Sequence, residues 1–157
     1  MGFCLFSAPS EAANPTSGTT VANTYEVAFS LQTLLPNRLP DLDKTPFVYG
    51  PMVGIPVGAH TIQLRALYGS VDSLSLFLLE PALRFNFSTP FFGGYVLAGA
   101  QLLHYSNAGN SHEQWGGHLG TGFVMPMGTR YKWQMGIKMY VFRRTLASFE
   151  GSFCFLL

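Results

Sequence analysis

Apolar and polar residues alternate one by one along eight separate segments of this chain. Successive side chains of an extended strand point to opposite faces, so alternation indicates a strand with one apolar and one polar face. In residues 130–142, for example, Tyr131 and Trp133 share one face, while Lys132 and Gln134 share the other. This feature restricts the fold more than any other, because a helix would require a period of about 3.6 residues.

The alternating segments predict eight strands joined by turns. They cover residues 22–32, 47–55, 60–68, 72–87, 91–105, 115–125, 130–142 and 145–157. Short turns are predicted after the second, fourth and sixth segments, and Gly69-Ser70 is predicted to turn the chain after the third. A proline-rich connection follows the first segment, and a longer polar loop is predicted over residues 107–114.

The composition indicates a membrane protein. Hydrophobic residues make up 48% of the 157 residues and charged residues only 11%, against about 25% charged residues in a typical soluble domain. No run approaches the roughly 18 apolar residues of a membrane-spanning helix. Apolar residues spread by alternation are what a transmembrane β-barrel needs. The net charge of +1, without a basic cluster, argues against nucleic acid as a partner.

The polar faces carry charges of both signs, which could pair inside a barrel. These charges belong to Glu26, Arg65, Glu80, Arg84, Lys132, Lys138 and Glu150. A barrel of eight strands is filled by its own side chains, which argues against a porin. Pro51 and Pro81 fit less well, because a closed barrel has no free edge, so each proline requires a bulge or a different strand boundary.

We therefore predict an all-β protein, an eight-stranded antiparallel up-and-down transmembrane β-barrel of the bacterial outer membrane, formed by residues 21–157. Residues 1–20 are predicted to be a signal-peptide remnant or a periplasmic tail. Short turns and both termini are expected in the periplasm. The last segment resembles the C-terminal strand of bacterial outer-membrane proteins, although it ends in Leu157 where phenylalanine is usual. The expected aromatic girdles at the interfaces include Tyr25, Phe85, Phe87, Tyr131 and Trp133.

A histidine and a serine stand two residues apart at the end of the fifth segment. In a strand His104 and Ser106 share one face, so the imidazole is close enough to reach the hydroxyl. A base beside a hydroxyl is the arrangement of a nucleophilic site. If the face that carries Val96 and Leu102 is in contact with lipid, both residues lie on the outer wall near the headgroups. A histidine there is costly unless it has a function.

Residues His104-Tyr105-Ser106-Asn107-Ala108 resemble the His-x-Ser-Asn-Ala motif of the PagL-type lipid A 3-O-deacylases. Those proteins are eight-stranded outer-membrane barrels whose active site faces the membrane. The motif has the corresponding place here, because it closes the fifth strand. The similarity covers the barrel as an architecture, and identity is concentrated in this one motif.

The resemblance implies a role for each residue of the motif. Ser106 would be the nucleophile and His104 its general base. Asn107 and the backbone N–H of Gly109 would stabilise the oxyanion of the tetrahedral intermediate. The substrate would be the ester-linked 3-hydroxyacyl chain of lipid A, the membrane anchor of lipopolysaccharide, hydrolysed without a metal or another cofactor.

The resemblance also implies a third residue, early in the sixth strand, that holds the histidine. Glu113 is the nearest acid and has the parity of Trp115 and Leu119 on the predicted lipid face, so it is preferred. His118, twelve residues after Ser106, is the alternative.

Other interpretations of the same residues stay open. His104 and Ser106 could be ordinary polar residues at the membrane interface. The barrel would then have a non-catalytic structural or interaction role. A soluble barrel that carries lipid is a third alternative, which the low charge disfavours. Lipid A and membrane lipid are the expected partners, and a homodimer stays open.

Overall fold

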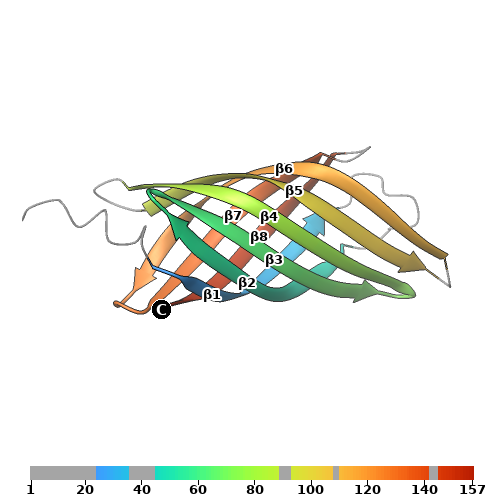
Figure 1. The fold of residues 1–157 in the computed structure, drawn as a ribbon. Helices are drawn as coiled ribbons and strands as arrows, with labels where there is room; N and C mark the ends of the chain where they lie inside the picture. Colours follow the sequence, from blue (N-terminus) through green and yellow to red (C-terminus); the bar gives the residue numbers. More distant parts are fainter. Residues whose placement is uncertain (1–23, 36–44, 89–92, 108–109, 142–144) are drawn as a thin grey trace, which may run out of the picture.

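The structure, a computed structural model, describes residues 24–35, 45–88, 93–107, 110–141 and 145–157. Eight strands follow one another in chain order. They are β1 (Glu26–Leu35), β2 (Phe47–Val57), β3 (His60–Val71), β4 (Leu74–Ser88), β5 (Gly93–Asn107), β6 (Asn110–Met127), β7 (Tyr131–Val141) and β8 (Thr145–Leu156). Each strand is antiparallel to the next and β1 also pairs with β8, so the sheet closes on itself (Figure 1). The predicted eight-stranded up-and-down barrel is confirmed.

The alternation separates an apolar outer wall from a largely polar interior. In β2, Tyr49 and Val53 point outward and are 49% and 43% exposed, whereas Val48 and Met52 are fully buried. All the predicted interior charges are buried, namely Glu26, Arg65, Glu80, Arg84, Lys132, Lys138 and Glu150. An apolar outer wall suits lipid, which offers no hydrogen bonds to polar side chains. The described residues contain no helix that is long and apolar enough to cross a bilayer.

Aromatic side chains gather on the outer wall toward both ends of the barrel. The predicted set lies toward the end that holds Leu157, and all of these residues face outward: Tyr25, Phe85, Phe87, Tyr131 and Trp133. A second set toward the opposite end was not predicted: Phe47, Tyr49, Tyr68, Phe77 and Trp115. Two such girdles bracket the apolar band of a membrane-spanning barrel.

The two prolines lie within regular strands, without the expected bulge. Pro51 pairs with Phe29 of β1, and the β2–β3 register is the same on either side of it. Pro81 likewise pairs with Leu64 of β3, while the β4–β5 register continues unchanged past it. Proline has no N–H, so each of these residues lacks a hydrogen bond to only one of its two neighbouring strands. The pairing is interrupted at that point, and no bulge is needed.

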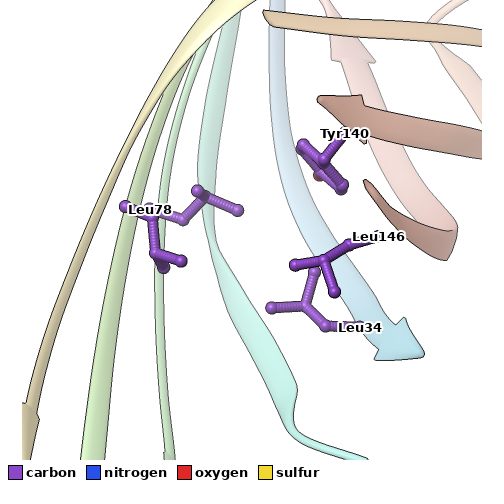
Figure 2. A pocket seen from close by; sticks show the side chains of 5 residues that line it. Leu34, Leu78, Tyr140 and Leu146 are labelled. Carbon is purple, nitrogen blue, oxygen red and sulfur yellow. The ribbon is translucent and has the colours of Figure 1, made fainter. Parts of the chain in front are cut away.

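The interior changes character along the barrel. Its charged side chains occupy the middle and the end near Leu157, whereas an apolar cluster fills the opposite end. Figure 2 shows Leu34, Leu78, Tyr140 and Leu146 of this cluster pointing into a common hollow. The hollow, which Leu103 also lines, has no space for a water molecule. A filled interior agrees with the sequence argument against a porin.

Glycines let one large interior side chain fit against the barrel wall. A Cβ on Gly122 would collide with the backbone oxygen of Met135 and lie 2.5 Å from the Tyr95 hydroxyl. We expect Gly122→Ala to lower the free energy of unfolding by about 1–3 kcal/mol through overpacking. Gly117→Ala in the same strand is the matched control, because its nearest contact would be Gly99 O at 3.6 Å. Urea unfolding of both variants in phospholipid vesicles checks this, and equal stabilities would contradict it.

Two sequence predictions about connections are wrong. The turn predicted at Gly69-Ser70 is strand, because β3 continues to Val71, and Asp72 adopts a positive φ of 53° at the turn. The loop predicted over residues 107–114 is a hairpin, because β5 ends at Asn107 and β6 begins at Asn110. Gly69-Ser70 has the composition of a turn although the side chains of β3 keep alternating to Val71. Residues 110–114 are polar on both faces, so they lack the alternation by which a strand is recognised. Residues 1–20, predicted to be a tail, lie outside the described residues.

Candidate functional site

The hairpin formed by β5 and β6 projects beyond the neighbouring wall of the barrel. Strand β7 ends at Val141 opposite Gly117, so within the described chain residues 110–116 of β6 pair only with β5. The β3–β4 hairpin lies beside it, and both extend toward the same end (Figure 1). The two hairpins therefore continue beyond the apolar band, and their ends carry polar residues at the rim of the barrel.

The two faces of β5 are distinct in the structure. Tyr95, Leu97 and Leu103 are at most 2% exposed and face the interior, whereas Val96 is 44% exposed on the outer wall. His104 and Ser106 have the parity of Val96, so both lie on the outer wall at the rim. The face that the sequence left conditional is therefore settled by the packing of the interior side chains.

Glu113 stands beside His104 on this outer wall. The two residues are direct cross-strand partners, and Nδ1 of His104 lies 3.4 Å from Oε1 of Glu113. Their side chains are 40% and 62% exposed, so the contact is open at the surface of the wall. A carboxylate at Nδ1 orients an imidazole and leaves Nε2 to act as the base.

Ser106 lies two residues further along β5. Neighbours at this spacing are about 6.6 Å apart along a strand, a distance that an imidazole can span. Among the described residues no hydrogen bond joins His104 to Ser106. Such a gap is common in free enzymes, where catalytic hydrogen bonds tighten only when substrate binds.

The structure does not bring the amide of Asn107 beside Ser106. Asn107 has the opposite parity, and its Oδ1 accepts a hydrogen bond of 2.9 Å from the Ser73 hydroxyl of the β3–β4 turn. Gly109, the other expected oxyanion donor, lies outside the described residues. The oxyanion role of these two residues stays a prediction.

His118 is wrong as the alternative partner of His104. It faces the interior, is 3% exposed, and its Nδ1 lies 3.1 Å from Oε1 of Gln101. The sheet itself separates it from the outer wall. Within the described chain, no group of three or more His, Cys, Asp or Glu side chains is placed to bind a metal ion.

Three further serines on the outer wall were not predicted from the sequence. Ser70, Ser75 and Ser111 come from three strands and join Ser106 only through the strand register. No linear motif connects them, and two of them fall where a turn and a loop were predicted. Only the correct pairing of strands could have shown them.

No protein-family model and no curated protein sequence matches this chain. Among solved structures, the N-terminal β-barrel domain of Pseudomonas aeruginosa OprF is similar with a TM-score of 0.72 and 13% identity, over 86% of this chain and 98% of that one. Neisserial surface protein A (NspA) has a TM-score of 0.65 and 14% identity, over 86% and 96%. Ail, the attachment invasion locus protein of Yersinia pestis, has a TM-score of 0.59 and 10% identity, over 85% and 97%.

These similarities show the fold: an eight-stranded antiparallel barrel of the kind found in bacterial outer-membrane proteins. The apolar outer wall and the two aromatic girdles agree with a place in that membrane.

Proposed function

We propose that this protein is an outer-membrane esterase that removes the ester-linked 3-hydroxyacyl chain from lipid A. The observation that carries the proposal is the 3.4 Å contact between His104 Nδ1 and Glu113 Oε1 on the outer wall, beside Ser106. Glu113, His104 and Ser106 follow one another as the acid, base and nucleophile of a hydrolytic triad do. All three lie on the outer wall, which is in contact with membrane lipid.

The chemistry follows from this order. Ser106 Oγ attacks the ester carbonyl carbon while His104 Nε2 takes its proton, and Glu113 stabilises the imidazolium that forms. The lipid A alkoxide leaves with the proton from His104, which gives an acyl ester on Ser106. Water, activated by the same imidazole, then attacks that ester, releases the 3-hydroxy fatty acid and restores the serine.

The outer wall below the triad provides a surface for acyl chains. Leu102 and Ala100 continue the outer face of β5, and Trp115 and Leu119 of β6 are 72% and 63% exposed. An acyl chain aligned with this wall stays in the bilayer while its ester reaches the headgroup level, where water is available. A site on the outside of the barrel is therefore suited to a substrate that never leaves the membrane.

Incubating the detergent-purified protein with lipid A and weighing the products by mass spectrometry tests the proposal. We expect the loss of one hydroxyacyl chain and the appearance of the free 3-hydroxy fatty acid. An unchanged lipid A mass with folded protein would overturn the esterase assignment.

A non-catalytic structural or interaction role is the second candidate function. The similar barrels reported above favour it, since none of their names describes an esterase and Ail is named for attachment and invasion. The position of the Asn107 side chain, away from Ser106, also favours it. Under this alternative, lipid A keeps all its acyl chains and variants at His104 and Ser106 have no effect on it.

The contribution of Glu113 can be measured separately. We expect Glu113→Gln to lower kcat by about 10²-fold, less than the about 10⁴-fold loss for a buried carboxylate in this role, because the His104–Glu113 contact is open to water. Glu113→Asp keeps the charge and should recover part of the rate. An unchanged kcat for Glu113→Gln would show that Glu113 does not hold His104 during the reaction.

A further inference from the structure

Four serines form a continuous row across the outer wall at the rim. Ser70 of β3 pairs with Ser75 of β4, Ser75 pairs with Ser106 of β5, and Ser106 pairs with Ser111 of β6. Adjacent strands are about 4.8 Å apart, so the row extends over about 14 Å. Four neighbouring strands thus present one hydroxyl each along a single line.

All four side chains point away from the interior. Ser70 and Ser111 are exposed, while Ser75 and Ser106 are half-buried. The next row of the wall pairs Tyr68 with Phe77, Phe77 with His104, and His104 with Glu113. Below that row the wall is apolar, so the serines stand where the lipid-facing surface ends.

These hydroxyls have no hydrogen-bond partner among the residues that the structure describes. Among the described residues, none of the four serine side chains makes a hydrogen bond, whereas the interior hydroxyls of Ser30 and Ser152 bond each other at 2.8 Å. Hydroxyls at the headgroup level of a bilayer are satisfied by water or by a ligand. The row is therefore open to a molecule that offers several hydrogen-bonding groups along a line.

The charges nearby indicate which molecule. The described acids at this rim are Asp72, in the turn beside Ser70, and Glu113. Serine and carboxylate oxygens accept hydrogen bonds, so they suit the hydroxyl and amide N–H groups of a sugar.

We infer that the row of Ser70, Ser75, Ser106 and Ser111 binds the saccharide of a glycolipid in the outer leaflet, with the sugar rings lying across β3 to β6. The acyl chains then continue down the apolar wall, and the ester next to the sugar lies at Ser106. The placement of that ester rests on the proposed function, whereas the binding of the saccharide does not.

The double variant Ser75→Ala/Ser111→Ala, which keeps Ser106, tests the inference with two substrates. We expect KM for lipid A to rise about 10-fold or more through the loss of two hydrogen bonds. Hydrolysis of the p-nitrophenyl ester of 3-hydroxymyristic acid, which has no sugar, should be unchanged. Thr33→Ala/Thr145→Ala, which removes two outward hydroxyls from β1 and β8, is the matched control and should change neither. Equal losses on both substrates, or no loss, would overturn the inference.

A binding measurement separates this inference from the proposed function. Native mass spectrometry can compare retention of lipid A with retention of phosphatidylglycerol, an anionic lipid without a saccharide. We expect the wild type to prefer lipid A and the double variant to lose that preference, whether or not either protein hydrolyses an ester. A wild type that retains both lipids equally, or a variant that loses both equally, would overturn the assignment to a saccharide.

Discussion

Replacing Ser106 with alanine is expected to lower the rate of lipid A deacylation by at least about 10³-fold, because removing a nucleophile eliminates the acyl-enzyme pathway. Ser106 makes no hydrogen bond with the described protein, so its loss should leave the barrel intact. The measurement is the initial rate of release of 3-hydroxy fatty acid from lipid A in mixed micelles.

The control for Ser106→Ala is Thr145→Ala, which removes an exposed hydroxyl at the start of β8, outside the candidate site. It should retain the wild-type rate. If Ser106→Ala deacylates lipid A as fast as the control, Ser106 is not the nucleophile. The contact of His104 with Glu113 would then be a polar contact at the membrane interface without catalytic meaning.

Glu26→Gln is expected to lower the free energy of unfolding by about 3–5 kcal/mol, the usual cost of leaving buried charges without their counter-charge. Glu26 Oε1 contacts Arg84 Nη2 at 2.5 Å and also contacts Lys132, while Glu26 Oε2 accepts a bond of 3.3 Å from Gln134. Among the described residues it is the one carboxylate that pairs with Arg84 or Lys132. Glutamine keeps the shape of the side chain but leaves both cations unpaired.

Urea titration of the barrel in phospholipid vesicles measures this cost. Glu113→Gln is the matched control, because it makes the same chemical change at a 62% exposed carboxylate and should change stability by less than about 0.5 kcal/mol. Similar stabilities for Glu26→Gln and the control would show that the interior charges find other partners. The interior network would then not be what stabilises this end of the barrel.

Much of the fold could be predicted from local pattern. Alternation in segments such as residues 130–142 identified strands, and the charges on their polar faces identified the interior. The prolines were the exception, because Pro51 and Pro81 need only one interrupted ladder each, a detail that depends on which neighbour their missing N–H faces. The turn at Gly69-Ser70 was placed wrongly because a Gly-Ser pair is a turn signal in the sequence, whereas the pairing of β3 with β4 continues to Val71.

Part of the candidate site was also accessible from sequence. The parity of His104 and Ser106 placed them together on one face, and the parity of Glu113 made it the preferred partner. The contact of Glu113 with His104 depends on the pairing of β5 with β6. The sequence did not predict this pairing, because residues 107–114 were predicted to be a loop and Glu113 lies among them.

The sequence by itself determined which residues share a face, because side-chain direction in a strand follows from local geometry with a period of two. It thereby determined the barrel class, the apolar wall and the His104–Ser106 pair. Only the tertiary structure decided which residues of different strands stand opposite each other, and thus the placement of Glu113 at His104, the position of Asn107 away from Ser106, and the row of serines. Register depends on hydrogen bonding between segments far apart in the chain, and a shift of one residue would move every side chain to the other face.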